Sequence, residues 1–459
     1  MKNNRIYFLG IGGIGMSALA QYFLAEGSDV FGYDLTPSPI TDMLTEKGAV
    51  IHFDDNCARI PEHIDFVVYT PAVPRTNAEF QHFVQAGTPM YKRSQVLGHI
   101  TERMPSIAVA GTHGKTTTTS MVCHLLAPEV SIAGFIGGIA KNFNDNLVLG
   151  EHPVMAVAEA DEFDRSFLTL HPAVAVITSM DADHLDIYGS REQLVEAFAQ
   201  YARQSRTLVV EEQVAEEISH PDKRVYGLLP EADYQACNIT LKPNRATFDL
   251  RTPDGTLQGL QLRANGIYNV LNATAAIAAI LEEAKQNPTL RTITNANAIS
   301  GKLQTFAGVK RRFDYIIERD DLIFIDDYAH HPQEMRSFIT AVRGIYPDKR
   351  ICGIFQPHLY SRTRDFAPQF AEVLALLDEV ILLPIYPARE KPIPGITSDY
   401  LLSLIDHPHK TVLQKEELVP YLQEHRPDVL LTIGAGDIDR LLPAMAESLT
   451  GKEVSLPNE

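Results

Sequence analysis

The chain has 459 residues, more than one hydrophobic core usually supports, so we expect two to four domains. Hydrophobic residues make up 45% of the chain, which is typical of a globular protein. The 40 Lys and Arg residues against 58 Asp and Glu residues give a net charge of −18. Such a charge argues against nucleic acid and anionic membranes as partners, so an anionic substrate has to be held by local groups.

The cysteines and the N-terminus indicate a reducing, cytoplasmic location. The four cysteines are scattered, with no C-x-x-C spacing, which argues against a disulfide framework or a zinc site. The apolar N-terminal stretch is interrupted by four glycines and therefore does not resemble a signal peptide. No apolar run reaches the roughly 18 residues that a membrane span needs, so no membrane insertion is expected.

Strand-like and helical segments alternate in three successive blocks, at residues 1–104, 105–309 and 310–459. This alternation predicts an α/β protein with parallel, doubly wound sheets in all three blocks. Between about residues 222 and 262 the pattern changes to short alternating stretches, which predict an antiparallel patch on a mixed sheet. Residues 269–284 are rich in alanine and predict a buried helix.

The first strand-like run, RIYFL, leads into a glycine-rich turn. Gly10, Gly12 and Gly15 form G-x-G-x-x-G, and Asp34 lies 19 residues beyond Gly15. Such a turn lets the backbone approach a diphosphate at a helix N-terminus. Taken alone the motif favours NAD, with other diphosphates as the alternative. Nothing further along the chain clearly supplies hydride chemistry.

A second loop follows the run SIAVA and predicts a site for ATP. Gly111, Gly114, Lys115 and Thr116 form a phosphate-binding loop in which the lysine reaches the β- and γ-phosphates and the threonine hydroxyl binds Mg²⁺. The loop is shorter than the usual G-x-x-x-x-G-K-[ST], because Val109 stands where the first glycine is expected.

Acidic residues follow two later strand-like runs, where open α/β sheets bind their ligands. The first group is Glu159, Asp161 and Glu162, and the second is Asp181, Asp183, His184 and Asp186. Since Mg²⁺ prefers oxygen ligands, chemistry alone favours the carboxylates over His184.

The order of these motifs resembles the Mur ligase family of cytoplasmic, ATP-dependent amide ligases of peptidoglycan synthesis. The resemblance covers nearly the whole chain, through GIGGIGMSALA, AGTHGKTTTT, AEADEFDRSFL, DADHLDIY, NGIYNVLNATAA, KRRFD, DDYAHHP, FQPHLYSRTRD and YPAREKPIPG. It implies Rossmann-like first and last domains around a central P-loop domain with a mixed sheet. GIGGIGM, DDYAHHP and YPAREKPIPG are most similar to the branch that joins L-alanine to UDP-N-acetylmuramate.

The resemblance implies a role for each matched position. The UDP diphosphate would be held by Gly10, Gly12, Gly13, Gly15, Met16 and Asp34. ATP would be bound by Gly111, Thr112, His113, Gly114, Lys115, Thr116 and Thr117, with Asn269 and Asn272 at the adenine and Arg311 or Arg312 near the phosphates. Mg²⁺, with Mn²⁺ as an alternative, would be held by Thr116, Glu159 and His184. The incoming amino acid and the reacting carboxylate would be met by Asp327, Tyr328, His330, His331 and Arg362.

Among these residues, Lys115, His330 and Arg362 are the catalytic candidates. His330 is expected to hold or deprotonate the amine, with Asp327 to orient it, and the alternative is that His330 and His331 only shape a turn. Arg362 and Arg364 either grip a carboxylate or phosphate or form solvated ion pairs. Tyr386, Arg389 and the loop at residues 434–437 are weaker candidates.

Three departures from the family pattern are visible. Leu359 stands where many relatives have arginine, and Tyr268 replaces a histidine near the expected adenine site. No lysine lies between His184 and Tyr201, where several sister ligases carry a modified one. This last departure fits the L-alanine branch better than the later-acting branches.

The implied reaction phosphorylates a carboxylate with ATP and lets the amine of L-alanine attack the acyl phosphate, giving an amide, ADP and phosphate. Closure of the third domain over the second is expected to exclude water. The alternatives are a recycling ligase that attaches a tripeptide to the same sugar nucleotide, an NAD-dependent oxidoreductase and a non-catalytic P-loop switch. A monomer and a homodimer both remain open.

Overall fold

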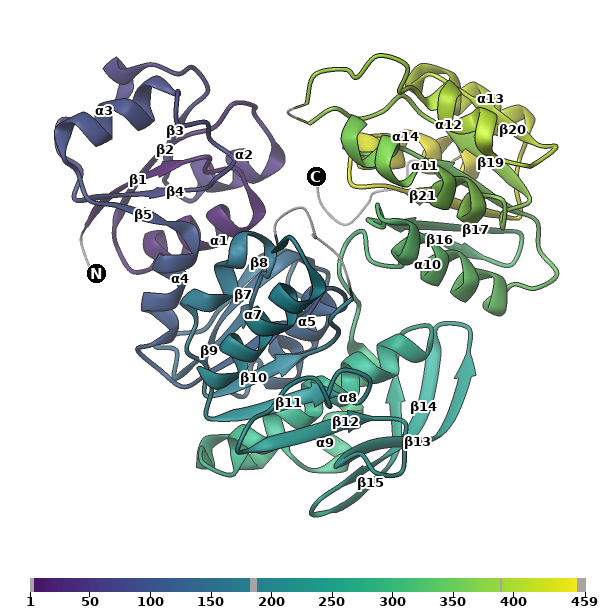
Figure 1. Cartoon of the computed structure of the whole chain (residues 1–459). Coiled ribbons are helices and arrows are strands. Elements are labelled where there is room, and N and C mark those ends of the chain that lie inside the picture. The colour runs from purple at the N-terminus through teal and green to yellow at the C-terminus, as the bar shows by residue number, and fades with distance from the viewer. Residues whose placement is uncertain (1–3, 182–187, 389, 452–459) are drawn as a thin grey trace. The chain divides into compact units, whose positions relative to one another are not determined.

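We describe a computed structural model of the chain for residues 4–181, 188–388 and 390–451 (Figure 1). Contacts group the chain into two units that divide between Gly308 and Val309. The first unit contains two sheets and the second contains one. In the described residues no helix is both long enough and apolar enough to cross a membrane.

The N-terminal sheet has five parallel strands in the order β3-β2-β1-β4-β5. Its strands are β1 (Arg5–Leu9), β2 (Asp29–Tyr33), β3 (Val50–His52), β4 (Phe66–Tyr69) and β5 (Met90–Lys92). Its helices are α1 (Ile14–Ala25), α2 (Pro39–Glu46), α3 (Ala78–Ala86) and α4 (Arg93–Thr101). Residues 6–9 of β1 are buried, because the middle strand of a parallel sheet is covered on both faces. The parallel sheet predicted for this block is confirmed.

The second sheet has ten strands in the order β15-β14-β13-β12-β11-β10-β6-β9-β7-β8. They are β6 (Ser106–Ala110), β7 (Ile132–Ala140), β8 (Asp145–Leu149), β9 (Met155–Glu159), β10 (Val174–Ile177), β11 (Thr207–Glu211), β12 (Lys223–Gly227), β13 (Tyr234–Lys242), β14 (Arg245–Thr252) and β15 (Gly255–Leu262). The predicted mixed sheet is confirmed.

Two details of the prediction for this sheet are wrong. The antiparallel patch begins one strand later than expected, since β12 pairs in parallel with β11 and β13 and only β13, β14 and β15 are antiparallel. Strand β8 is antiparallel to β7 at the other edge. The two-residue connection at residues 253–254 joins antiparallel neighbours, because so short a turn brings the next strand back beside the first.

Two helices of this domain pack against each other, α5 (Lys115–Leu126) and α8 (Ile267–Ala284). The predicted alanine-rich buried helix is confirmed as α8, whose small side chains let it approach its neighbours closely. The domain also contains η2 (Phe163–Thr169), α7 (Arg191–Arg203), η3 (Pro288–Ile293) and α9 (Ala296–Thr305).

Helix α1 joins the two sheets of the first unit by packing on β7 and β8. The Asn146 side-chain amide donates to the carbonyl oxygen of Ile14 and, at 2.9 Å, to the hydroxyl of Ser17. The Gln21 amide donates to Asn146 at 3.0 Å. The polar groups of Gln21 and Asn146 thus find their partners inside the protein, and these bonds fix the position of α1, the helix that follows the first glycine loop.

The second unit has a six-stranded sheet in the order β16-β17-β21-β18-β19-β20. Its elements are β16 (Asp314–Arg319), β17 (Leu322–Asp327), α10 (Pro332–Ile345), β18 (Ile351–Phe355), α11 (Tyr360–Leu374), β19 (Glu379–Leu382), α12 (Ser398–Leu404), β20 (Lys410–Val412), α13 (Leu418–Glu424), β21 (Val429–Ile433) and α14 (Leu442–Thr450). Strands β17 to β21 are parallel. The all-parallel prediction is wrong only for β16, which reaches β17 through a two-residue turn and is antiparallel to it.

Candidate active site

The second phosphate loop lies between β6 and the N-terminus of α5. Gly111 has φ +140°, and a Cβ atom added there would lie 2.1 Å from the Thr178 hydroxyl oxygen. Both the backbone angle and the close approach require glycine. Val109 is buried inside β6. The loop therefore bends two residues after the position of the first glycine in the longer motif.

The residues after β10 brace this loop. The backbone N–H of His113 donates to the Ser179 hydroxyl at 2.8 Å, and the Thr112 and Ser179 hydroxyls lie 2.9 Å apart. The imidazole of His113 lies 3.3 Å from the carboxylate of Asp181, and its hydrogen bond lowers the pKa of that carboxyl. Sequence reasoning missed Thr178 and Ser179. Both residues directly follow the strand-like run that forms β10, and that position was the signal in the sequence. Because β10 and β6 are parallel neighbours, their carboxyl ends lie together.

Lys115 lies across the loop and is paired with a buried carboxylate. Its Nζ donates to the Gly111 carbonyl at 2.6 Å and lies 2.8 Å from an oxygen of Glu162, whose side chain is 1% exposed. Burial acts to lower the pKa of Lys115, but the carboxylates of Glu162, Asp161 and Glu159 outweigh it and raise that pKa. The lysine therefore stays cationic, as a ligand of ATP phosphates must.

The predicted metal ligands are only partly within the described residues. Thr116 is buried at the start of α5, and Glu159 ends β9, where its carboxylate accepts a hydrogen bond from the Gly137 N–H at 2.9 Å. His184 lies outside the described residues. In the described part of the chain, no three His, Cys, Asp or Glu side chains converge as a metal cage. A hydroxyl and carboxylates are nevertheless hard oxygen donors, and they fit Mg²⁺, which keeps several waters and binds phosphate oxygens.

The two asparagines of α8 lie beside the loop. A Cβ atom added at Gly114 would lie 2.6 Å from the Asn272 side-chain oxygen, which also accepts from the Thr118 hydroxyl at 3.2 Å. The Asn272 amide donates to Asn269 at 3.3 Å. The structure thus brings residues from two distant sequence segments to one place. Tyr268 folds its ring over Gly266, within 2.5 Å of a Cβ atom added there.

The first glycine loop lies between β1 and α1. Gly10 has φ +86°, and its N–H donates to the Tyr33 carbonyl at 2.8 Å. The Gly12 N–H donates to the carboxylate of Asp34 at 2.7 Å. Asp34 therefore touches the loop itself, and the buried side chain of Met16 anchors the first turn of α1. Gly13 is the N-cap of that helix, and Gly15 lies in its first turn.

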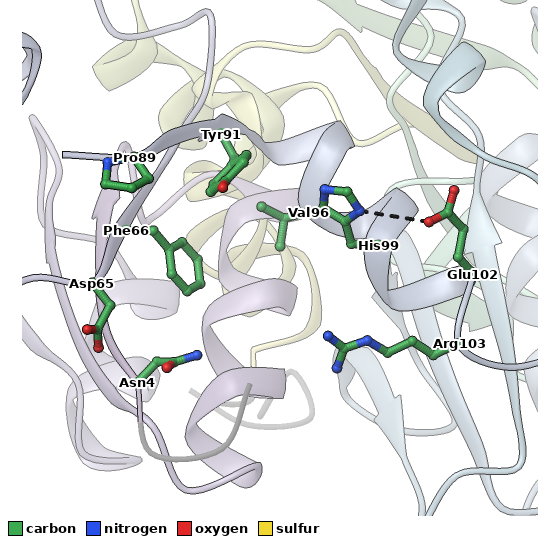
Figure 2. Close-up of a pocket in the computed structure, with 9 residues that line it drawn as sticks. All are labelled: Asn4, Asp65, Phe66, Pro89, Tyr91, Val96, His99, Glu102 and Arg103. Atoms are coloured by element: carbon green, nitrogen blue, oxygen red, sulfur yellow. Dashed lines mark ion pairs between the residues drawn. The ribbon is translucent and has the colours of Figure 1, made fainter. Parts of the chain in front are cut away.

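A cavity of about 540 Å³ lies at the amino ends of the strands of the N-terminal sheet, whereas the glycine loop lies at their carboxyl ends (Figure 2). It is lined by Asn4, Asp65 and Pro89, which directly precede β1, β4 and β5. The other side is formed by α4 and the residues after it, where His99 pairs with Glu102 at 3.8 Å. Ligands of parallel sheets bind at the carboxyl ends of the strands, so this cavity is not part of the candidate site.

In the second unit, Arg311 and Arg312 both lie against the Tyr328 ring, with their guanidinium carbons 5.0 and 5.2 Å from its centre. Arg311 binds Asp326 at 3.2 Å and the Gly436 carbonyl at 3.1 Å, so its donors hold the loop at residues 434–437. The Arg312 guanidinium has no hydrogen bond to another described residue. Arg312 is therefore the better placed of the two to meet a phosphate.

Asp327 is committed to the backbone. Its carboxylate accepts from the Phe313 N–H at 2.7 Å and from the Ala329 N–H at 2.8 Å. Burial raises its pKa to about 6, although Arg312 and these N–H groups act to lower it. The group that His330 Nδ1 contacts is the Tyr328 carbonyl, with Glu334 beside it, so an orienting role for Asp327 stays a prediction.

His330, His358 and Arg362 form a cluster, which we call the C-terminal cluster. The His330 Nδ1 lies 3.0 Å from the Tyr328 carbonyl and 3.4 Å from Glu334, so Nδ1 carries the proton and Nε2 the lone pair. Burial lowers the pKa of His330, and the Arg362 charge adds to this while Glu334 opposes it. A neutral imidazole with its Nε2 lone pair available is the form that a general base requires.

Two nitrogens of the C-terminal cluster are buried without a hydrogen-bond partner among the described residues, the Nδ1 of His358 and an Nη of Arg362. His358 stacks on Tyr386 at 5.7 Å, and burial lowers its pKa to about 4. Buried donors are almost always satisfied, so the unpaired Arg362 nitrogen indicates a site for an anion.

The remaining candidate residues near this cluster make contacts that explain their positions in the fold, except for Arg389. His331 is the N-cap of α10, and its ring packs on Phe366 at 4.7 Å. Arg364 is exposed and pairs with Asp365 at 2.7 Å, as the solvated ion-pair alternative predicts. Leu359 is the N-cap of α11 and has φ +71°, which is a strained angle for a branched side chain. Arg389 lies outside the described residues.

Three domain profiles match the chain in order. They are described as the Mur ligase family catalytic domain at residues 5–104, the Mur ligase middle domain at residues 109–280 and the Mur ligase glutamate ligase domain at residues 311–436. A UDP-N-acetylmuramate–L-alanine ligase of Flavobacterium johnsoniae is 43% identical, with 97% of each chain covered. A ligase of the same name from Porphyromonas gingivalis is 44% identical, with 95% of this chain and 97% of that one covered.

Solved structures agree with these matches. A UDP-N-acetylmuramate–alanine ligase from Thermotoga maritima has a TM-score of 0.81 at 29% identity, covering 98% of this chain and all of that chain (100%). A murein peptide ligase from Psychrobacter arcticus has a TM-score of 0.70 at 22% identity, covering 98% of this chain and 99% of that one, and at that identity it shows the fold alone. The chain belongs to the Mur ligase family of ATP-dependent ligases.

Proposed function

We propose that this chain joins L-alanine to the lactyl carboxylate of UDP-N-acetylmuramate, with ATP converted to ADP and phosphate, as a step of peptidoglycan precursor synthesis in the cytoplasm. The observation that carries the proposal is the 43–44% identity over nearly the full length to relatives of that name. The identity extends over the residues matched by all three Mur ligase domain profiles. We propose domain boundaries at 104/105 and 309/310 and either a monomer or a homodimer.

The chemistry requires activation, because a carboxylate repels nucleophiles and would have to expel oxide. The lactyl carboxylate oxygen attacks the γ-phosphorus of ATP, and the bond to the β-γ bridging oxygen breaks to release ADP. The amine of L-alanine then attacks the acyl phosphate carbon and expels phosphate. These steps need charge stabilisation at the transferred phosphoryl group and removal of a proton from the amine.

The second loop meets the first need. The N–H groups at the N-terminus of α5 would meet the phosphates, and Lys115 would exchange Glu162 for phosphate oxygens. We assign Asn269 and Asn272 to the nucleotide. Of Arg311 and Arg312, we assign Arg312 to the phosphates. A bound Mg²⁺, held by Thr116 and Glu159 and by His184 from the undescribed segment, would neutralise charge on the phosphate oxygens.

The C-terminal cluster meets the second need. Arg362 offers its unpaired donor to a carboxylate, and His330 accepts the proton of the amine at Nε2. Tyr328, which contacts Arg311 and Arg312, and His331 complete the proposed surroundings of the amino acid. Asp327 supports the loop on which His330 stands.

The first loop takes the diphosphate of the sugar nucleotide, through the glycines at 10, 12, 13 and 15, Met16 and Asp34. The same geometry is compatible with other diphosphates, because it recognises phosphate and not the attached group. NAD becomes the weaker choice since the second loop is built for ATP.

Phosphate release from ATP tests the proposal. We expect release only when UDP-N-acetylmuramate, L-alanine and Mg²⁺ are all present, with an alanyl product of matching amount by mass spectrometry. Release that requires the tripeptide instead of L-alanine would assign the chain to recycling. Oxidation of NADH by the enzyme would contradict the ligase assignment.

A further inference from the structure

Arg93 stands between the two phosphate loops of the first unit. It is the first residue of α4, and a Cβ atom added at Gly15 would lie 2.7 Å from its Nη1. The guanidinium therefore lies against the first turn of α1, the turn that ends the glycine loop. Its Nη2 lies 3.6 Å from the carboxylate of Asp161, which follows β9 beside the ATP loop.

The packing of α4 sets this position. A Cβ atom added at Gly98 would lie 2.4 Å from the Thr169 carbonyl oxygen, so α4 and η2 touch backbone to backbone. The Thr169 hydroxyl donates to the Ser94 carbonyl at 2.8 Å. Both contacts tie α4 to the segment that follows Asp161, so the approach of Arg93 to Asp161 is built into the fold.

The charges around the first loop call for a cation. Residues 9–16 contain no Lys or Arg, the whole chain carries −18, and Asp34 already places a carboxylate on the Gly12 N–H. A helix N-terminus supplies only about half a charge, and a diphosphate carries about two. Arg93 has a forked guanidinium that suits phosphate, and at 3.6 Å its pair with Asp161 is loose.

We propose that Arg93 binds the diphosphate of the sugar nucleotide and that Asp161 is its positioning residue. The proposal rests on the proposed function, which supplies the ligand. Asp161 is followed by Glu162, the partner of Lys115. Two adjacent carboxylates, Asp161 and Glu162, thus pair with the two cations that lie at the two phosphate loops, Arg93 and Lys115.

Binding of UDP-N-acetylmuramate to the full chain, measured by calorimetry without ATP, tests this. We expect Arg93→Ala to raise the Kd about tenfold or more, since charge-assisted bonds to phosphate are lost, and Arg93→Lys to lie between. Lys92→Ala is the matched control, because Lys92 precedes Arg93 and makes a similarly exposed pair with Asp164 at 3.1 Å but does not contact Gly15. Its Kd should stay within about twofold of the unmodified chain, since it loses only a surface ion pair.

Asp161→Asn tests the positioning role. The Asp161 oxygen that accepts from the Phe163 N–H at 3.1 Å is kept in asparagine, so the turn persists while the charge is lost. We expect the Kd to rise about threefold or more, and the double variant with Arg93→Ala to bind no more weakly than Arg93→Ala alone. Binding of an ATP analogue should be unchanged in Arg93→Ala, which a general loss of structure would not allow.

Equal weakening by Arg93→Ala and Lys92→Ala, or additive effects of Asp161→Asn and Arg93→Ala, would overturn the inference. A failure of the proposed function is a different result, in which the unmodified chain does not bind UDP-N-acetylmuramate. Binding by the unmodified chain that Arg93→Ala leaves intact rejects the inference alone.

Discussion

The second phosphate loop and the C-terminal cluster differ in how their cations are satisfied before a ligand binds. Lys115 is already paired with the buried Glu162, which raises the cost of leaving either one alone. In the C-terminal cluster, His358 and Arg362 each have a buried nitrogen without a partner among the described residues. Under the proposed function, Lys115 exchanges an internal carboxylate for phosphate oxygens when ATP binds. The cluster instead holds a buried Arg362 donor with no partner among the described residues, which a bound carboxylate would satisfy.

The largest expected effect comes from removing the lysine. Lys115→Met should lower turnover by about 10³-fold or more, because the positive charge that stabilises the phosphoryl group during its transfer is lost. It should also destabilise the fold by about 3 kcal/mol, since the buried carboxyl of Glu162 loses its ion pair with the Lys115 ammonium. Steady-state phosphate release and denaturant unfolding measure the two effects.

Lys115→Met combined with Glu162→Gln separates them. If the buried pair explains the stability loss, the double variant regains stability and remains inactive. Recovery of turnover in the double variant would contradict the role of Lys115 at the phosphates.

Replacing His330 tests the base in the C-terminal cluster. His330→Asn should lower kcat by about 10²-fold, the usual contribution of a general base. Burial lowers the pKa of His330 below the ordinary 6.5 of an imidazole, so the neutral base persists to a lower pH than a free histidine would allow. The acid limb of the pH–activity profile of the unmodified enzyme should therefore lie below pH 6.5. A pH profile of His330→Asn that keeps the same acid limb would assign that limb to another group.

Arg362→Gln should raise the KM for L-alanine or for the reacting carboxylate about tenfold, because the unpaired guanidinium donor is lost. The same change removes a positive charge that disfavours the imidazolium forms of His330 and His358, so both pKa values should rise. NMR titration of the histidine ring protons checks this without relying on activity. Arg364→Gln, which only loses an exposed pair with Asp365, is the control and should move neither pKa.

The last comparison concerns the stability of the two phosphate loops and includes the smallest expected effect, that of Gly13→Ala. Gly111→Ala should destabilise the protein by about 2–3 kcal/mol, because φ is +140° and the added carbon would meet Thr178 at 2.1 Å. Gly13→Ala should cost less than about 1 kcal/mol, since the nearest atom would be 3.5 Å away and φ is −66°. Thermal unfolding of both variants measures the difference. Equal destabilisation would contradict the tighter bracing of the second loop.

Much of the site could be predicted from the sequence because its signals are local. Both glycine loops directly follow buried strands, and the strand and the helix around Lys115 are contiguous in the chain. The alanine-rich helix α8 was predicted for the same reason, since its composition and period are carried by one segment.

The partners of these residues could not be predicted in the same way. Ser179 braces His113 from 66 positions away, and Asn272 reaches Thr118 from 154 positions away. The partners of Asp327 have the same origin, because its proximity to His330 in sequence did not reveal that its carboxylate accepts from the N–H groups of Phe313 and Ala329.

By itself, the sequence determined the three α/β blocks, the two phosphate loops and the family, since each rests on the order of residues within short segments. Only the tertiary structure decided which carboxylate pairs with Lys115, which arginine keeps its donors open and how Arg93 comes to lie between two loops. Those outcomes depend on parallel strands ending at one edge and on helices packing across them. Such contacts join residues far apart in the chain, and no local pattern specifies them.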